Sequence, residues 1–587
     1  MSESQKFENL LNLALSATEQ ERQRSEVLET GYDEEEGSWE LIVRYHGDAE
    51  AIRALPGARV ETLLGGYAIV WLPREQIDAL AALTEVEYVE KPKQLLYEVE
   101  NGRAVSCIDS LQPGAALGQM EGLTGRGILV AILDSGIDYS LSDFRNPDGT
   151  TRILFLWDQT LEREFTGEEI DAALAAESEE ERFRLVPSRD LSGHGTAVAG
   201  IAAGAGSPET GRYRGVAPES DLLIVKLGTA GARSFPRTTQ LMRGLDYVLR
   251  KGIELRRPVA VNISIGNTYG SHDGDSLLET FIDEAAGFSS NCIVIGSGNE
   301  GGTAGHYAGT LAAPVPGDEG SQTVEMSVGV YETGLSVQLW KSYADEFAVE
   351  LIAPSGAVVG PFIPELGTAR YHLGGVEILL YYGEPKPYTR SQEIFVDFLP
   401  ENTYLDSGVW KFRLTPRRIV DGRYNLWLPG ASLLNRGTQF LRRSPQVTLT
   451  IPSTAIRAIT VGAYDSRNDT YADFSGRGFL RSLDLVKPEL AAPGVDVITA
   501  VPGGGYSART GTSFAAPFVT GGAALLMEWG IVKGNDPYLY GEKVKAYLIR
   551  GARQLGISAQ EYPNRRVGYG ALCVRSSLPG FAGRGTG

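Results

Sequence analysis

Six short apolar runs, separated by segments with helical patterns, constrain the fold of this 587-residue chain more than any other feature. Each run is continuously apolar rather than alternating, which is typical of strands buried on both faces. Strands of this kind, separated by helices, form a mostly parallel sheet covered on both sides, the doubly wound α/β class. The sequence therefore predicts strands of such a sheet at residues 128–133, 222–227, 259–265, 293–295, 459–461 and 495–500.

The N-terminal part of the chain has a different pattern. Residues 1–36 are typical of a helical extension that ends in an acidic hinge. Residues 37–97 then predict a strand, a helix, a strand pair turning at Gly65-Gly66, a second helix and a last strand. That β-α-β-β-α-β order is the ferredoxin-like motif, so we expect a small separate unit there.

Between residues 318 and 447 the pattern changes again. Short alternating or β-rich runs are separated by turn residues such as Pro354-Ser355-Gly356, and no helical segment lies between them. Runs of this kind predict an all-β sandwich, which we interpret as a jelly roll. It interrupts the α/β domain, whose two parts we place at residues 98–317 and 448–587.

Three short strings in the α/β part carry the residue types of a nucleophilic triad. Asp134 closes an apolar run, His194 opens a helix of small residues, and Ser513 opens another helix. The order Asp, His, Ser is one of the few chain orders in which such a triad recurs. We interpret His194 as the base that takes the proton of Ser513, and Asp134 as the group that holds the imidazole tautomer.

Two further segments suit the binding of a peptide substrate. Asn299 follows a buried strand and can offer its side-chain amide to a developing oxyanion. The segment 264–266 ends another strand, and its backbone can pair with an extended peptide. The residues expected to bind substrate are Ser264, Ile265, Gly266, Ser297 and Gly298.

These motifs resemble those of the subtilisin-like serine proteases (peptidase family S8), over residues 100–315 and 448–580. The resemblance implies the subtilase fold, the triad and oxyanion roles of Asp134, His194, Ser513 and Asn299, and serine endopeptidase activity. It also makes residues 37–97 similar to a subtilase propeptide, which acts as an intramolecular chaperone and inhibitor.

The distances between the motifs narrow the resemblance. Asp134 and His194 are 60 residues apart, about twice the usual spacing in that family, and the excess includes an acidic, helix-like stretch at 168–181. The β insert lies between Asn299 and Ser513. With the propeptide, these features resemble the clostridial Csp germination proteases. That resemblance implies self-cleavage between about residues 95 and 107, a propeptide that stays bound, and activation of a spore-cortex hydrolase zymogen by limited proteolysis.

Two other functions stay open. A propeptide that permanently covers the triad would leave a non-catalytic scaffold or sensor protein. The aromatic residues of the insert are compatible with a carbohydrate-binding module, although the core of a sandwich also takes most aromatic side chains. These residues are Trp340, Tyr371, Tyr381, Tyr382, Tyr388 and Trp410.

Composition excludes several classes of partner. A net charge of −20 argues against nucleic acid and anionic membranes. The three cysteines (Cys107, Cys292 and Cys573) are an odd, sparse set that predicts no disulfide framework and fits a reducing compartment. The first residues lack a signal-peptide pattern and we find no membrane-spanning run, so we expect synthesis in the cytoplasm. We also expect a monomer, and the resemblance implies association with the spore.

We expect no cofactor and no metal ion. The segment 204–209 lacks the Asn-rich loop that holds the strong Ca²⁺ site of the family that the chain resembles. Phe514 follows the nucleophile where subtilisins usually carry Met, which removes a thioether that peroxide would oxidise.

Overall fold

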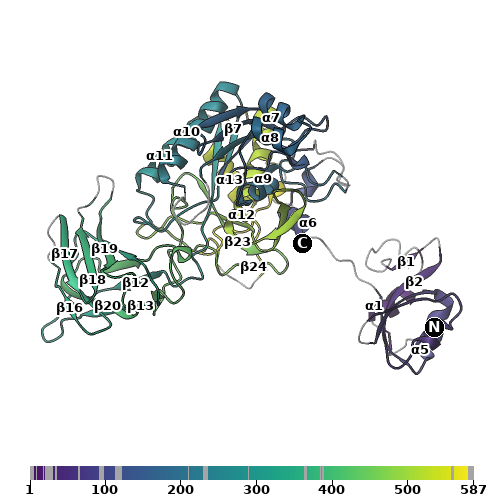
Figure 1. Cartoon of the computed structure of the whole chain (residues 1–587), viewed down its shortest axis with the longest axis horizontal. Coiled ribbons are helices and arrows are strands. Elements are labelled where there is room, and N and C mark those ends of the chain that lie inside the picture. Colours follow the sequence, from purple (N-terminus) through teal and green to yellow (C-terminus); the bar gives the residue numbers. More distant parts are fainter. Residues whose placement is uncertain are drawn as a thin grey trace. The chain divides into compact units, whose positions relative to one another are not determined.

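The computed structural model describes residues 6–7, 9–16, 19, 31–33, 36–63, 66–91, 98–112, 122–208, 210–228, 236–288, 290–362, 367–383, 385, 389–556 and 561–579. The chain forms two compact units, Met1–Tyr97 and Glu98–Gly587 (Figure 1).

The first unit is an antiparallel sheet in the order β3-β4-β2-β5, with the short β1 beside the far end of β2. This is the strand order of the ferredoxin-like motif, which is therefore confirmed. Trp39, Leu41 and Val43 alternate along β2 into the core, which α1 also joins through Leu11. The elements are α1 (Asn9–Ser16), β1 (Tyr32–Asp33), β2 (Ser38–Tyr45), α4 (Glu50–Arg53), β3 (Arg59–Leu63), β4 (Tyr67–Pro73), α5 (Ile77–Ala82) and β5 (Val86–Glu90).

The second unit is built on a nine-stranded sheet in the order β24-β23-β11-β10-β6-β9-β7-β8, with β25 pairing to β23. Neighbouring strands from β23 to β7 run parallel. At the two edges, β8 pairs antiparallel with β7, and β24 pairs antiparallel with β23. The predicted doubly wound sheet is thus confirmed. Its strands are β6 (Leu129–Asp134), β7 (Ile153–Asp158), β8 (Arg163–Thr166), β9 (Asp221–Lys226), β10 (Val259–Ile263), β11 (Asn291–Gly296), β23 (Ile459–Asp465), β24 (Thr470–Tyr471) and β25 (Leu490–Pro493).

Helices cover both faces of this sheet (Figure 1). Side chains of α9, α12 and α13 share one core with one face, and those of α10 and α11 share a second core with the other. The small residues of α9 allow close packing, since a Cβ at Gly200 would come within 2.6 Å of Thr499 Oγ1. The helices are α9 (His194–Ala203), α10 (Thr238–Leu255), α11 (Leu277–Ala285), α12 (Thr512–Met527) and α13 (Gly541–Gly551).

Among the residues that the structure describes, one segment, Thr512–Val532, is long and apolar enough to cross a membrane by length and composition. Within the fold, 83% of its apolar window is buried, because α12 packs against α9 and the strands of the sheet. Burial of this kind is typical of a helix in the core of a folded domain.

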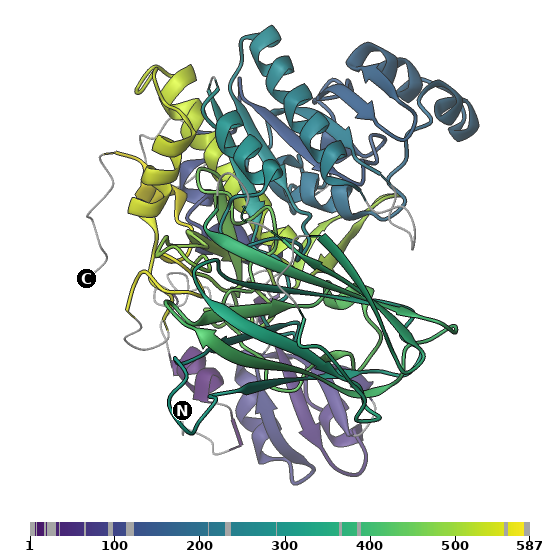
Figure 2. The ribbon, with the colours of Figure 1, turned by 90° about the vertical axis from the view of Figure 1, so that its left-hand side faces the viewer.

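Residues 306–440 form two antiparallel sheets whose inner faces share one hydrophobic core, drawn in green in Figure 2. The predicted all-β character of this segment is confirmed, and its strands begin before residue 318. Tyr382 and Trp410 belong to this core, and Tyr371 packs against it. Trp340 is buried outside this core, Tyr381 is exposed, and Tyr388 lies outside the described residues. One sheet has the order β12-β21-β14-β19-β18-β17, and the other β16-β15-β20-β13-β22.

Along β19 and β20, buried positions alternate with half-buried ones, whereas β14 is buried along nearly its whole length. They are β12 (His306–Thr310), β13 (Gln322–Val328), β14 (Leu335–Ser342), β15 (Glu346–Ile352), β16 (Val358–Val359), β17 (Gly367–Leu373), β18 (Val376–Tyr382), β19 (Ser391–Pro400), β20 (Gly408–Arg418), β21 (Arg423–Trp427) and β22 (Gln439–Phe440).

One local prediction is wrong. The run 495–500 does not join the parallel sheet: β25 lies beside β23 instead, and β26 (Val497–Ala500) turns back to pair with β27 (Tyr506–Arg509). Both runs are apolar, so composition could not distinguish them. The acidic, helix-like stretch 168–181 is helical in two parts, because Ser178 caps a second helix. The two helices are α7 (Gly167–Leu174) and α8 (Glu179–Leu185).

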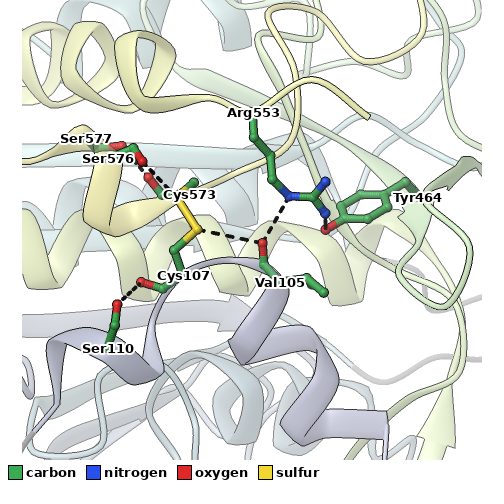
Figure 3. The surroundings of a disulfide bond; sticks show 8 residues. All are labelled: Val105, Cys107, Ser110, Tyr464, Arg553, Cys573, Ser576 and Ser577. Carbon is green, nitrogen blue, oxygen red and sulfur yellow. Dashed lines mark hydrogen bonds between the residues drawn. A yellow bond between two sulfur atoms is a disulfide. The ribbon is translucent and has the colours of Figure 1, made fainter. Parts of the chain in front are cut away.

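The expectation that the cysteines form no disulfide is also wrong. Cys107, just after α6 (Glu98–Val105), is bonded to Cys573, just before α14 (Val574–Ser577), across 466 residues of sequence (Figure 3). Arg553 Nε donates to the carbonyl of Val105 beside this bond. The sequence spacing of two cysteines carries no information on their distance in space, and the third, Cys292, is free and buried.

Candidate active site

The predicted site residues gather where three neighbouring strands end. Leu133 of β6, Ile263 of β10 and Ile295 of β11 are paired in register. The residues that follow them lie side by side at the carboxyl edge of the sheet, where groups that act on ligands gather in α/β folds. These residues are Asp134, Ser264 and Gly296.

Asp134 and His194 form a direct pair at this edge. His194 Nδ1 lies 2.7 Å from Asp134 Oδ1, and the carboxylate is buried while the imidazole side chain remains 31% exposed. Burial lowers the pKa of His194, but the Asp134 carboxylate and, less strongly, Asp190 raise it, so that the net pKa lies above the usual 6.5. An ionised carboxylate at Nδ1 holds the proton there and leaves Nε2 as the basic nitrogen.

A second buried carboxylate, Asp190, holds the first turn of α9 and was missed by sequence reasoning. Asp190 Oδ1 accepts from Gly193 N at 2.9 Å and from Ser135 Oγ at 2.8 Å. Asp190 Oδ2 accepts from the backbone N–H and the hydroxyl of Thr196. The only signal in the sequence is an acidic residue just before a helix, which favours the positive helix end but is common.

Ser513 lies in the first turn of α12, and its hydroxyl interacts with the neighbouring strand end. Ser513 Oγ donates to the carbonyl of Ser264 at 3.1 Å, and Ser264 Oγ donates to the carbonyl of Ser513 at 3.1 Å. The ring of Phe514 packs beside the imidazole of His194, with 5.4 Å between centroids. The structure thus brings the first turn of α12 to the Asp134–His194 pair.

Asn299 is oriented by the residue before the serine. Its Oδ1 accepts from Thr512 N at 3.0 Å and from Thr512 Oγ1 at 3.2 Å. Holding the oxygen in this way turns the Nδ2 amide outward, and no hydrogen bond of Nδ2 is found among the described residues. An amide oriented like this can donate to an oxyanion formed at Ser513.

The residues predicted to bind substrate divide into two groups. Ile265 and Gly266 line a pocket of about 330 Å³ that begins just after Ser264. Gly298 lies in the loop before Asn299, with a φ of +87°, and its N–H donates to Thr512 Oγ1. Ser297 is fully buried, with its hydroxyl 3.3 Å from that of Ser475, so its side chain lies inside the domain.

Within the described part of the chain, no group of three or more His, Cys, Asp or Glu residues could hold a metal ion. At this edge of the sheet the predicted site residues offer a hydroxyl, an imidazole paired with a carboxylate, and an oriented amide.

Comparison with known proteins identifies relatives of both units. The Csp protease B prodomain matches residues 5–93, and the Subtilase family matches residues 125–378 and 435–570, more than half of the chain. The solved structure of the Clostridium perfringens CspB protease has 37% sequence identity and a TM-score of 0.75, and the match covers 81% of this chain and 96% of that one.

Two curated proteases are also similar to this chain, at lower sequence identity. Minor extracellular protease Vpr of Bacillus subtilis (strain 168) is 24% identical over 574 residues, which are 90% of this chain and 62% of Vpr. An intracellular serine protease of Paenibacillus polymyxa is 30% identical over 214 residues, 36% of this chain and 52% of the relative. The chain thus spans less than two thirds of these curated relatives.

Proposed function

Because this chain belongs to the subtilase family and carries a Csp protease B prodomain, we propose that it is a serine endopeptidase. Asp134, His194 and Ser513 would form its catalytic triad, and the peptide would be cut through an acyl-enzyme. The observation that carries the proposal is the 2.7 Å contact between His194 Nδ1 and Asp134 Oδ1, at the edge of the sheet where α12 presents Ser513.

In the proposed reaction, the proton moves through His194 Nε2. Ser513 Oγ forms a bond to the substrate carbonyl carbon as its proton passes to Nε2, and Asp134 stabilises the imidazolium. The same proton passes to the leaving amine as the carbon–nitrogen bond breaks. Water then attacks the ester carbonyl carbon and gives one proton to Nε2. As the bond from that carbon to Ser513 Oγ breaks, Nε2 returns the proton to Oγ, which releases the acid and restores the serine hydroxyl.

Two features of the unbound site show what must change, and what is already in place, for this reaction. The Ser513 hydroxyl donates to the Ser264 carbonyl, so it has to turn about its Cα–Cβ bond towards His194 when substrate binds. Catalytic hydrogen bonds are often long or poorly aligned in enzymes without substrate, and they tighten when substrate binds. Asn299 Nδ2 and the backbone N–H of Ser513 at the start of α12 would then donate to the oxyanion.

We also propose that the chain cuts itself once, on the N-terminal side of α6. A protease binds the bond that it cuts in an extended conformation along a strand. Residues 98–105 are helical and do not offer such a bond, which favours cleavage before Glu98. Residues 92–97 lie outside the described residues.

The biological role follows from the likeness to CspB alone. We propose that the processed protease activates a zymogen by limited proteolysis during spore germination, and that its prodomain stays bound after cleavage. On this proposal the protein is a monomer, made in the cytoplasm and associated with the spore.

The test compares the full chain with Ser513→Ala by intact mass and by labelling with a fluorophosphonate. We expect the unaltered chain to lose about 10 kDa of its 63.3 kDa, the share of the prodomain, while Ser513→Ala stays intact. The label should attach to Ser513 of the processed protein only.

Other results decide against the proposal. If both proteins keep their full mass and neither is labelled, the serine is not a nucleophile. If the chain is processed but the label never attaches, the bound prodomain seals the site and the protein is a scaffold after a single cut. Co-elution of the two fragments in gel filtration tests whether the prodomain remains bound.

A further inference from the structure

We propose that the β insert forms part of the substrate cleft. The turn at 430–433, which contains the short 3-10 helix η4 (Ala431–Leu433), walls a pocket beside the segment 264–266, and Leu433 selects an apolar side chain of the bound peptide. This inference rests on the proposed protease function and adds a specificity residue from a domain that contributes no triad residue.

The pocket is continuous with the candidate active site. It begins at Ile265 and Gly266, directly after Ser264, whose carbonyl accepts from the Ser513 hydroxyl. Gly430, Ser432 and Leu433 of the insert line it as well. A peptide paired with the strand end at 264–266 would direct alternate side chains towards the domain, and one of them would meet this pocket.

The walls of the pocket favour an apolar occupant. Leu241 of α10 and Leu278 of α11 line it and are almost fully buried, and Ile265 adds a third apolar wall. Leu433, by contrast, is 53% exposed. An aliphatic side chain in the pocket would therefore contact apolar groups on several sides and remove Leu433 from water. A volume of about 330 Å³ is at the lower end for ligand sites and suits a single large side chain.

A large side chain has little room nearer to Gly298. Thr450 fills the space between Gly266 and Gly298: a Cβ at Gly266 would come within 2.7 Å of Thr450 Oγ1, and one at Gly298 would clash with the same side chain. The room for a bulky substrate residue is therefore in the pocket that the insert walls.

The turn at 430–433 is held in place by the loop that carries Asn299. Ala431 N donates to Glu300 Oε1 at 3.2 Å, and Thr303 Oγ1 donates to Glu300 Oε2 at 2.9 Å. Glu300 directly follows Asn299 in the chain. The wall of the pocket and the proposed oxyanion donor therefore belong to one connected structure.

A second set of contacts fixes the insert to the loop after β10. The indole of Trp427 on β21 stacks between two imidazoles, with centroids 4.2 Å from His272 and 4.6 Å from His306. His272 belongs to the loop after β10, where Thr268 Oγ1 also donates to the carbonyl of Leu428. All three rings are buried. The insert thus meets the cleft with a fixed geometry, as a specificity wall requires.

The experiment measures cleavage preferences of the processed full chain with a positional library of quenched fluorescent peptides. We compare the unaltered protein with Leu433→Glu and with Leu441→Glu, a matched change of an exposed leucine in the same insert but outside the pocket. At one peptide position, the unaltered protein should prefer Leu over Ala about 10-fold or more in kcat/KM.

Leu433→Glu should lose that preference and favour Lys or Arg at the same position, while the other positions keep their profile. Leu441→Glu should match the unaltered protein, and fluorophosphonate titration should give equal active fractions for all three. Identical profiles for all three active proteins overturn this inference and leave the protease proposal standing. If the unaltered chain has no Ser513-dependent cleavage, the protease proposal fails and the inference fails with it.

Discussion

Replacing Asp190 by Asn should lower kcat/KM and move the acid limb of the pH profile to lower pH. The Asp190 carboxylate accepts five hydrogen bonds, the four described above and one from Ser192 Oγ at 3.2 Å, and they tie the strand end at Asp134 to the first turn of α9. It also lies close enough to His194 to raise the pKa of the imidazole. The change therefore affects both the position and the protonation of the proposed base.

The hydrogen bonds set the size of the loss. Asn has one acceptor oxygen, and its amide group would face donors of Thr196 or Gly193. Each buried donor left without an acceptor costs about 1–3 kcal/mol, so that two of them would lower the free energy of unfolding by about 2–6 kcal/mol. A displacement of His194 by about 1 Å would lower kcat/KM by up to about 10²-fold.

The electrostatic effect has a definite sign. Burial lowers the pKa of His194, while Asp134 and then Asp190 raise it. Removing the charge of Asp190 disfavours the imidazolium and lowers this pKa. Because the proposed base acts in its neutral form, activity should persist to a lower pH in Asp190→Asn than in the unaltered protein.

The assay is kcat/KM against pH with one peptide substrate, together with thermal unfolding of each protein. Asp345→Asn is the matched control, because Asp345 is fully buried in the insert and accepts from the backbone N–H groups of Val420, Asp421 and Gly422. It should lose similar stability without a shift of the acid limb. An unchanged acid limb in Asp190→Asn, or the same shift in both variants, would refute the reasoning.

Three other changes have distinct expected results. Asn299→Ala should lower kcat about 10²–10³-fold with little change in KM. A rise in KM with an unchanged kcat would argue against an oxyanion role. Cys107→Ser or Cys573→Ser should lower the free energy of unfolding by about 2–4 kcal/mol, because the disulfide links residues 466 positions apart. Calorimetry with and without reductant measures this loss, and an unchanged midpoint of thermal unfolding would contradict it. Activity should withstand mild peroxide, since buried Phe514, not Met, packs beside His194, whereas Phe514→Met should lose activity under the same treatment.

Local patterns were sufficient to predict much of this protein. Continuous apolar runs identified most strands of the parallel sheet, because burial on both faces is recorded in each strand by itself. The run 495–500 shows where this fails: it and β25 are both apolar, and only pairing with β23 distinguishes them. The residue types around Asp134, His194, Ser513 and Asn299 likewise predicted the chemistry that we propose, since each string combines a reactive side chain with the glycines or small residues that a strand end or helix start needs.

Only the tertiary structure decided the contacts between segments that are distant in the sequence. Asp190 is an ordinary acidic residue in the sequence, and its five hydrogen bonds exist only once β6 and α9 meet. The bond between Cys107 and Cys573, and the position of Leu433 beside Ile265, likewise depend on how separate elements pack. The physical reason is that periodicity and turn chemistry act within a few residues, whereas side-chain contacts between elements depend on the complete packed arrangement. The sequence by itself therefore determined the elements and the reactive groups, and the tertiary structure decided what holds and surrounds them.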